Sequence, residues 1–402
     1  MVGHVHPPDH PGEPIDQAVF LFFRAPHSYT GEDTVELTTH GSPLVMKALL
    51  EACLAADARL ADPGEFTRRA FLNGRMDLSQ AEAVASLIHA RTDEARRVMY
   101  NQVAGSMGNA VVRLRETLLH AKVVLESAID FPEDVEEADL AVLSGLLTSG
   151  ARMTGTLLAT AGRGIAMRNG ISVVIAGTPN VGKSSLFNSL LQEDRAIVHA
   201  AAGTTRDFIE GYMNIEGVPV VIVDTAGVRM GADGVEVEGV LRARKMMERA
   251  DLLLVVLDSS RELGRGDASL LREAEGATRI IVANKVDLPS IAEGLPEGTI
   301  RVSALTREGL DDLKQGIFNT CFGGKTTPLM DGAVVTSVRQ TAALRGVQEG
   351  CRSALESLTD NAGLECVAVG VDEALMHLGN LTGAVTTEDV LDEIFSRFCV
   401  GK

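Results

Sequence analysis

The segment 177–184 has the residue types and the spacing of a phosphate-binding loop. Its letters, G-T-P-N-V-G-K-S, fit the pattern G-x-x-x-x-G-K-[ST], and it lies between an apolar run, 171–176, and an amphipathic run, 185–191. Glycines permit backbone conformations that a Cβ forbids, so successive N–H groups can point at a phosphate, and the following helix adds its positive N-terminal end. The lysine would neutralise the outer phosphates, and the serine hydroxyl would bind Mg²⁺. The predicted nucleotide contacts are Asn180, Val181, Gly182, Lys183, Ser184 and Ser185.

A second motif, D-T-A-G, follows the apolar run 218–223. The carboxyl ends of strands in open α/β sheets are where ligands bind. The aspartate can therefore hold a Mg²⁺-bound water, and the glycine N–H can meet the γ-phosphate. The same letters also suit a plain turn at the end of a strand. The residues assigned to the nucleotide site are Asp224, Thr225, Ala226 and Gly227.

The base of the nucleotide is predicted from two motifs that each follow a further strand. In the segment 284–287, N-K-V-D, the final carboxylate can accept hydrogen bonds from the N1–H and N2–H₂ groups of guanine. Adenine lacks this donor pair, so ATP would leave the carboxylate unpaired. The segment 303–305, S-A-L, would offer a backbone N–H to the guanine oxygen. The residues that select GTP are therefore predicted to be Asn284, Lys285, Asp287, Ser303, Ala304 and Leu305.

The segment 203–207, G-T-T-R-D, lies between the phosphate loop and Asp224, where a switch must supply a threonine to Mg²⁺. Thr204 and Thr205 are its two threonines. Each of these five motifs is common, but their order and spacing together predict a GTPase domain.

The residue after Gly227 is Val228, at a position where many GTPases place a glutamine that orients the attacking water. An apolar side chain cannot do this, so hydrolysis must use an acid or a base from elsewhere. Asp233, Glu236 and Glu238 lie in the adjacent segment, although such acids also suit a solvated loop.

The composition restricts the remaining possibilities. A chain of 402 residues, 45% of them hydrophobic, has room for two or three domains. The formal net charge of −18 argues against a protein that coats nucleic acid through a general positive field. The five cysteines form no C-x-x-C pair, and no apolar segment approaches the ~20 residues that span a bilayer. We therefore expect a soluble cytoplasmic protein with reduced thiols.

The chain before the phosphate loop predicts two kinds of structure. Residues 1–17 have no periodic pattern, and we interpret them, with His4, His6 and His10, as a frayed terminus and not as a metal site. A strand over 18–23 that is buried on both faces, a half-exposed strand over 35–39 and a helix over 43–56 predict a small α+β unit. A capping box at Ser79 and Glu82 predicts a helix to about residue 91. Amphipathic stretches over 92–129 and 138–168 predict a helical bundle.

From residue 170 the chain predicts a parallel sheet with crossover helices, followed again by helices. The predicted strands are 171–176, 218–223, 252–257, 279–283 and 299–302. A linker is expected at Gly323-Gly324. The last helix follows a cap at Thr386 or Thr387 and carries the apolar stripe Val390, Leu391, Ile394, Phe395 and Phe398. The simplest account is a helical domain that is interrupted by an inserted nucleotide-binding domain.

Several motifs are more distinctive than any of these patterns. They are P-x-S-Y-T-G-E-D (26–33), P-G-E-F-T (63–67), A-F-L-N-G (70–74), D-L-x-Q-A-E-A (77–83), the switch 203–207 and the terminal F-C-V-G-K (398–402). They cover the chain from about residue 18 to its end, and they resemble the motifs of the tRNA modification GTPase family MnmE, also called TrmE.

The resemblance implies a Ras-like GTPase domain inserted in an all-α helical domain and preceded by a small α+β domain similar to a tetrahydrofolate-binding domain. The implied bounds are 1–76 for the N-terminal domain, 77–168 and 325–402 for the helical domain, and 169–324 for the GTPase domain. The implied activity is GTP hydrolysis in a complex that modifies C5 of the wobble uridine of certain tRNAs. The implied partners are the FAD-dependent protein MnmG, tRNA and a second copy of the chain. A membrane partner is not expected.

The resemblance also assigns roles to single residues. It implies that hydrolysis depends on K⁺ and on dimerisation of the GTPase domains, with K⁺ neutralising charge in the transition state. The implied K⁺ ligands are Asn180, Thr204 and the carbonyls of His199 and Ala201; Ser184 and Thr205 match the Mg²⁺ ligands. Glu236 matches the acid that orients water indirectly. Glu36, Arg75 and Lys402 match residues that line a site for 5-formyl- or methylene-tetrahydrofolate, and Cys399 matches a cysteine needed for tRNA modification.

Three features depart from the family pattern. The family begins with an additional β-α segment before the equivalent of Ile15, so either the start of this sequence is misplaced or part of the folate site has been lost. Arg75 stands where the family often has lysine, which keeps the charge but changes the donor geometry. His199 and the residues 200–202 differ from the usual polar start of the K⁺ loop, but their expected ligands are backbone carbonyls.

Two other functions compete with this interpretation. One is a GTP-regulated RNA or ribosome assembly factor without covalent chemistry, and the other is a nucleotide-gated scaffold that has lost the modification chemistry. The terminal motif 398–402 and the N-terminal motifs favour the tRNA-modifying enzyme, and a basic RNA-binding module typical of assembly factors is missing from the sequence.

Overall fold

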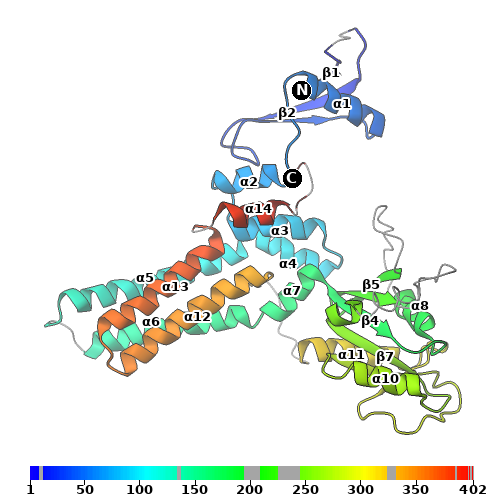
Figure 1. Cartoon of the computed structure of the whole chain (residues 1–402). Coiled ribbons are helices and arrows are strands. Elements are labelled where there is room, and N and C mark those ends of the chain that lie inside the picture. Colours follow the sequence, from blue (N-terminus) through cyan, green and yellow to red (C-terminus); the bar gives the residue numbers. More distant parts are fainter. Residues whose placement is uncertain are drawn as a thin grey trace. The chain divides into compact units, whose positions relative to one another are not determined.

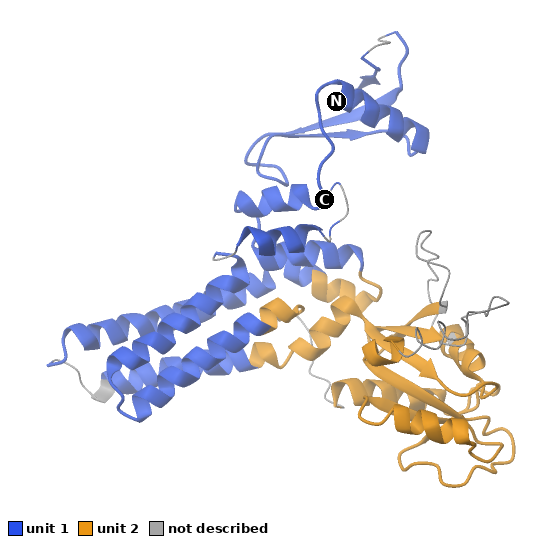
Figure 2. Cartoon of the chain, in the orientation of Figure 1, with its two compact units in different colours: residues 1–89, 100–155, 342–402 blue, residues 90–99, 156–341 orange. Residues whose placement is uncertain are grey.

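The computed structural model describes residues 1–8, 12–133, 137–193, 209–224, 245–323, 332–384, 387–396, 398 and 401. The chain divides into two compact units (Figure 2). The first unit contains residues 1–89, 100–155 and 342–402, and the second contains residues 90–99 and 156–341.

The first unit begins with an antiparallel sheet of three strands, β1 (Val2–Val5), β2 (Asp16–Phe23) and β3 (Thr34–Thr38), followed by helix α1 (Pro43–Ala55) (Figure 1). Two predictions were wrong here. Residues 2–5 are no frayed terminus, because Val2 lies opposite Val19 and Val5 lies opposite Asp16 in the ladder between β1 and β2. The strand β2 is not buried on both faces either: Ala18 is buried, whereas Phe22 is 65% exposed. An apolar run predicts a strand but does not tell what covers it.

The remainder of the first unit is helical. Its main helices are α2 (Glu65–Leu72), α3 (Leu78–Ile88), α5 (Ser106–Asp130), α6 (Glu137–Leu158), α12 (Val338–Thr359), α13 (Leu364–Thr382) and α14 (Glu388–Ser396). Leu125, Leu143 and Val371 belong to one buried cluster, so segments on both sides of the inserted domain share a core. This confirms the predicted helical character of both segments, and Figure 1 shows α5, α6, α12 and α13 as neighbouring long helices.

The predicted cap of α3 was displaced by two residues. The capping box is formed by Asp77 and Gln80, whose side chains accept from each other's backbone N–H groups at 2.8 and 2.9 Å. The hydroxyl of Ser79 instead donates to the carbonyl of Leu381, 3.1 Å away. The helix ends at Ile88, three residues earlier than predicted. The pattern S/T-x-x-E occurs within this segment, but Asp77 is the residue with the extended backbone that a cap requires.

The last helix packs against the motif 63–67. Leu391, Phe395 and Phe398 form a buried cluster with Leu78 and Ala81. Gly64 has a φ of +70°, and a Cβ at this glycine would lie 2.8 Å from the carbonyl oxygen of Phe395. The predicted stripe of α14 is therefore the surface that packs on α2 and α3.

The second unit is built on a six-stranded sheet with the order β5-β6-β4-β7-β8-β9. The strands are β4 (Ile171–Ala176), β5 (Ile209–Ile215), β6 (Val218–Asp224), β7 (Leu252–Asp258), β8 (Arg279–Asn284) and β9 (Ile300–Arg301). Five of them are parallel, and all five predicted strands are confirmed. The edge strand β5 was missed. It pairs antiparallel with β6 and alternates buried and exposed residues, whereas the predictions rested on continuous apolar runs.

Helices of the second unit position this sheet and its edges. Helix α8 (Lys183–Glu193) packs against β4, β5 and β6, α10 (Arg265–Glu273) against β7, and α11 (Leu310–Phe322) against β8 and β9 (Figure 1). The strand β4 lies between β6 and β7: the chain continues from β4 to β5 and β6 on one side and then crosses to β7 on the other. Such a change of direction leaves a crevice at the carboxyl ends of the strands.

The hairpin between β5 and β6 is held by two helical segments of the same unit. The Thr92 hydroxyl, just before helix α4 (Asp93–Val103), donates to the carbonyl of Gly217 at 2.6 Å. Arg163 of helix α7 (Ala161–Asn169) donates to the carbonyl of Glu216 at 3.1 Å. The guanidinium of Arg91 lies 3.8 Å from the centre of the Tyr212 ring. The hairpin therefore has fixed contacts at its turn and along β5.

Candidate functional site

The phosphate loop lies between the end of β4 and the start of α8, at the carboxyl edge of the sheet. Its backbone depends on two glycines that pack closely against other strands. Gly182 has a φ of +94°, and a Cβ there would lie 2.3 Å from Nδ2 of Asn284. A Cβ at Gly177 would lie 2.7 Å from the carbonyl oxygen of Val256 on β7. No side chain can replace either glycine without moving the loop away from its neighbours.

The last two residues of the loop, Lys183 and Ser184, lie near Asp224 at the end of β6. Lys183 Nζ donates to the carbonyls of Gly177 and Thr178, both at 2.9 Å. Burial lowers the pKa of the Lys183 ammonium below its usual value, while the Asp224 carboxylate acts in the opposite direction. The hydroxyl of Ser184 donates to Oδ2 of Asp224 at 2.7 Å. A hydroxyl and a carboxylate are oxygen donors of the kind that Mg²⁺ prefers, so these residues suit that ion.

The motifs predicted to select guanine are brought to the same edge by β8 and β9. The side-chain amide of Asn284 donates to the carbonyl of Val181 at 2.8 Å and accepts from the N–H of Ala304 at 3.0 Å. The Ser303 hydroxyl donates to Oδ1 of Asp287 at 2.5 Å. Asp287 and Leu305 are exposed, so the structure leaves them open to a ligand.

A carboxylate that the sequence motifs did not predict supports Lys285 of the segment 284–287. Asp258, at the end of β7, is 5% exposed and lies 2.6 Å from Lys285 Nζ. Burial raises the pKa of Asp258, but hydrogen bonds from Lys285 and Ser260 outweigh burial and hold the pKa below its usual value. Its position after the apolar run 252–257 matches that of Asp224 after 218–223, and this parallel was the available signal.

Several predicted residues lie outside the described residues. They are His199, Ala201, Thr204, Thr205, Thr225, Ala226, Gly227, Glu236, Cys399 and Lys402, together with Val228 and the alternative acids Asp233 and Glu238. The structure therefore places the phosphate loop, Asp224 and the base-selecting motifs, and leaves the switch, catalytic and terminal assignments as predictions.

The first unit contains a second candidate site. Glu36 and Arg75, which the resemblance assigns to a folate site, line one cavity of about 440 Å³ together with Phe23, His27, Ser28, Tyr29 and Thr34. The cavity brings together β3, the turn 28–33 and the residue after the motif 70–74. Tyr29 is fixed by a hydrogen bond of 2.9 Å between its hydroxyl and that of Thr67.

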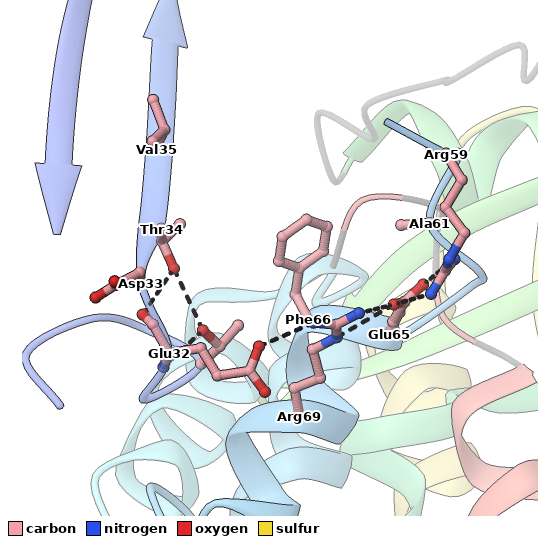
Figure 3. Close-up of a pocket in the computed structure, with 10 residues that line it drawn as sticks. Glu32, Asp33, Thr34, Val35, Arg59, Ala61, Glu65, Phe66 and Arg69 are labelled. Carbon is pink, nitrogen blue, oxygen red and sulfur yellow. Dashed lines mark hydrogen bonds and ion pairs between the residues drawn. The ribbon is translucent and has the colours of Figure 1, made fainter. Parts of the chain in front are cut away.

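A network of charges lies around a neighbouring cavity of about 260 Å³ (Figure 3). Arg69 donates to Glu32 at 2.8 Å and to Glu65 at 2.5 Å, and Arg59 donates to Glu65 at 2.5 and 2.8 Å. The hydrogen bonds from Arg59 lower the pKa of Glu65 to about 2. The motifs 26–33 and 63–67 are thus linked through the two carboxylates and Arg69. Within the described part of the chain, no helix is long and apolar enough to cross a membrane.

Comparisons with known proteins agree with this arrangement. A family model of the MnmE helical domain matches residues 78–399, and a model of the GTP-binding protein TrmE N-terminus matches residues 1–75. The tRNA modification GTPase MnmE of Aquifex aeolicus is 43% identical over 98% of this chain and 88% of its own length. Proteins of the same name from Natranaerobius thermophilus and Geobacter sulfurreducens are 40% and 42% identical, over 96% and 97% of this chain and 86% and 87% of theirs.

The strand order and the loop at the end of β4 define a P-loop GTPase with a Ras-like domain. Within this class, the chain belongs to the MnmE family, and its activity is that of a tRNA modification GTPase.

We predict that Gly182→Ala abolishes GTP binding, because the added methyl group would collide with Asn284 and move the backbone N–H groups that meet the phosphates. Gly276→Ala is the matched control: Gly276 also has a positive φ, +85°, but no atom lies within 4 Å of its Cβ position. The positive φ by itself should cost each variant about 1 kcal/mol of folding stability, and Gly182→Ala should lose more because of the collision with Asn284. Titration with a fluorescent GTP analogue checks the prediction. Tight binding by Gly182→Ala, or equal loss in both variants, would contradict the role given to this glycine.

Proposed function

We propose that the chain hydrolyses GTP within a complex that, together with the FAD-dependent protein MnmG, adds a carboxymethylaminomethyl-type group to C5 of the wobble uridine of certain tRNAs in the cytoplasm. The observation that carries the proposal is the match to MnmE relatives over 98% of the chain, which includes the N-terminal and the helical parts. A GTP-regulated RNA or ribosome assembly factor would be expected to resemble the MnmE relatives in its GTPase domain alone. The match also covers the N-terminal and helical parts, so this alternative is not favoured.

The proposed domains are an N-terminal folate-binding-like domain over 1–76, a helical domain over 77–168 and 325–402, and the GTPase domain over 169–324. The shared core of Leu125, Leu143 and Val371 supports one helical domain made from both sides of the insert. Limited proteolysis should release the segment 169–324 as a folded fragment. Cleavage that unfolds both parts together would contradict this division.

In the proposed mechanism, GTP lies across the edge formed by β4, β6, β7 and β8. The amides of 177–184 and Lys183 bind the phosphates, and Asp287 with the 303–305 segment binds guanine. Mg²⁺ would be held by Ser184 and Thr205, near Asp224, where it would offset phosphate charge. Asn180, which is exposed and has a φ of +65°, would contribute its side-chain oxygen to K⁺ along with His199, Ala201 and Thr204. Glu236 would orient the attacking water.

The cavity around Glu36 and Arg75 supports a site for 5-formyl- or methylene-tetrahydrofolate. A carboxylate can accept hydrogen bonds from the N–H groups of a pterin ring, and a guanidinium can donate to a carbonyl or carboxylate of the same molecule. Phe398, at the start of the terminal motif, packs beside Gly64 of the motif 63–67. Titration with 5-formyltetrahydrofolate tests the site, and a lack of saturable binding would refute it.

The exposed apolar residues of α1 support the proposed homodimer. The helix contains no buried residue, and Leu44, Met46 and Leu50 are 80%, 60% and 47% exposed. Several exposed apolar side chains on one helix are a feature of surfaces that bind another protein. A monomer in sedimentation equilibrium at micromolar concentration would contradict this proposal.

We predict that a strain that lacks this gene loses the C5 modification of wobble uridine, and that the wild-type chain restores it. The Gly182→Ala variant should fail to restore it because it cannot bind GTP, whereas Gly276→Ala should succeed. Mass spectrometry of tRNA nucleosides measures the outcome. Unchanged modified uridine in the deletion strain would eliminate the proposed function.

We predict that GTP turnover slows strongly when Na⁺ replaces K⁺, because the smaller ion does not fit a site built for K⁺. In KCl, Glu236→Ala should abolish turnover and keep GTP affinity near normal, since the acid would act on water and not on the nucleotide. Steady-state phosphate release and nucleotide titration give both results. Turnover that is indifferent to the cation would refute the Asn180 assignment, and equal loss of binding and turnover would show that Glu236 is structural.

A further inference from the structure

Asp267 is a buried carboxylate at the start of α10, beside the phosphate loop. Its side chain is only 1% exposed. Oδ1 accepts a hydrogen bond of 2.7 Å from the hydroxyl of Thr178, and Oδ2 accepts one of 2.9 Å from the N–H of Gly264. Arg261 lies 2.9 Å from Oδ2 and also donates to Oδ1 at 3.2 Å. One carboxylate thus connects the phosphate loop, the segment after β7 and its own helix.

The charge of Asp267 is balanced by these donors. Burial by itself raises the pKa of a carboxyl group, but the hydrogen bonds from Thr178 and Arg261 lower the pKa of Asp267 below its usual value. The group is therefore an ionised carboxylate at neutral pH. A buried charge is tolerated only where its partners are in place, so the positions of Thr178 and Arg261 are tied to it.

The start of a helix does not by itself account for this burial. Asp312 occupies the corresponding position in α11, three residues after Gly309, as Asp267 lies three residues after Gly264. Asp312 is exposed to solvent, whereas Asp267 faces the phosphate loop. Asp267 also caps its helix, by accepting from the N–H of the extended Gly264, whereas Gly309 is left-handed and Asp312 makes no such cap. The contacts that lead from Asp267 to the phosphate loop are those with Thr178 and Arg261.

Thr178, which donates a hydrogen bond to Asp267, is itself part of the nucleotide site. It is the second residue of the phosphate loop, and its carbonyl accepts a hydrogen bond of 2.9 Å from Lys183 Nζ. The packing on this side is close, because a Cβ at Gly266 of α10 would lie 3.0 Å from Cγ2 of Thr178. A shift of Thr178 would therefore alter both the path of the loop and the position of the phosphate-binding lysine.

We propose that Asp267 is a positioning residue for GTP binding, which holds the phosphate loop in its binding conformation through Thr178 and so links helix α10 to nucleotide affinity. Asp267 does not touch the nucleotide in this arrangement. The link depends on the Thr178 hydroxyl, so removing either partner has the same consequence.

The test compares Thr178→Val, Asp267→Asn and the double variant in the full-length chain. Each single variant is expected to raise the dissociation constant for a fluorescent GTP analogue about tenfold, as loss of a hydrogen bond to a buried charge would. The double variant should bind about as weakly as either single variant, because both remove the same link. Thr178→Ser, which keeps the hydroxyl, should retain nearly normal affinity.

Asp312→Asn is the matched control, and it should leave the dissociation constant unchanged. Thermal unfolding of every variant is measured alongside, so that a loss of affinity in a folded protein is separated from a loss of folding. The proposal is overturned if Thr178→Val binds GTP within twofold of the wild type. It is also overturned if the two single effects multiply in the double variant, or if Thr178→Ser binds as weakly as Thr178→Val.

Discussion

The side chain of Asn284 is the contact on which the nucleotide site depends. It is 1% exposed, and its single amide group joins the phosphate loop at Val181 to the segment 303–305 at Ala304. Leaving one of these buried groups without its partner costs about 1–3 kcal/mol. Gly182 is required beside it because a methyl group would occupy the space of the amide nitrogen. The parts that bind phosphate and the parts that bind guanine therefore form one assembly and not two adjacent motifs.

Other elements of the same unit hold this assembly in place. Asp258 holds Lys285 from the end of β7, and Asp267 holds Thr178 from the start of α10. At the β5 edge of the sheet, Thr92 and Arg163 hold the turn of the β5–β6 hairpin. The strand β6 ends at Asp224, so this hairpin leads directly to the carboxylate beside Ser184. Lys285, Thr178 and Ser184 thus each contact a carboxylate from a different strand or helix.

The sequence was most informative where one physical requirement dictates one residue type. The apolar parallel strands were predicted correctly because strands buried on both faces need continuous apolar runs. The close packing of Gly177 and Gly182 agrees with the glycine requirement of a phosphate loop. The sequence was least informative where contacts between distant segments determine which residues are buried and which residue caps a helix. Ala18 and Phe22 belong to the same apolar run, but only the first is buried, and Asp77 caps α3 although Ser79 fits the pattern. Asp258 lies 27 residues from Lys285, and Asp267 lies 89 residues from Thr178, so these two contacts could not be found from spacing.

The most direct test of the account is the nucleotide preference of Asp287→Asn. The Asp287 carboxylate, held by Ser303, is matched to the N1–H and N2–H₂ groups of guanine, whereas an amide can donate to the C2 carbonyl of xanthine. The affinity of the wild type and of the variant for GTP and for xanthosine triphosphate decides the question. The account predicts that the variant loses at least about 100-fold in GTP affinity and gains affinity for xanthosine triphosphate. A variant that binds GTP as tightly as the wild type would contradict it.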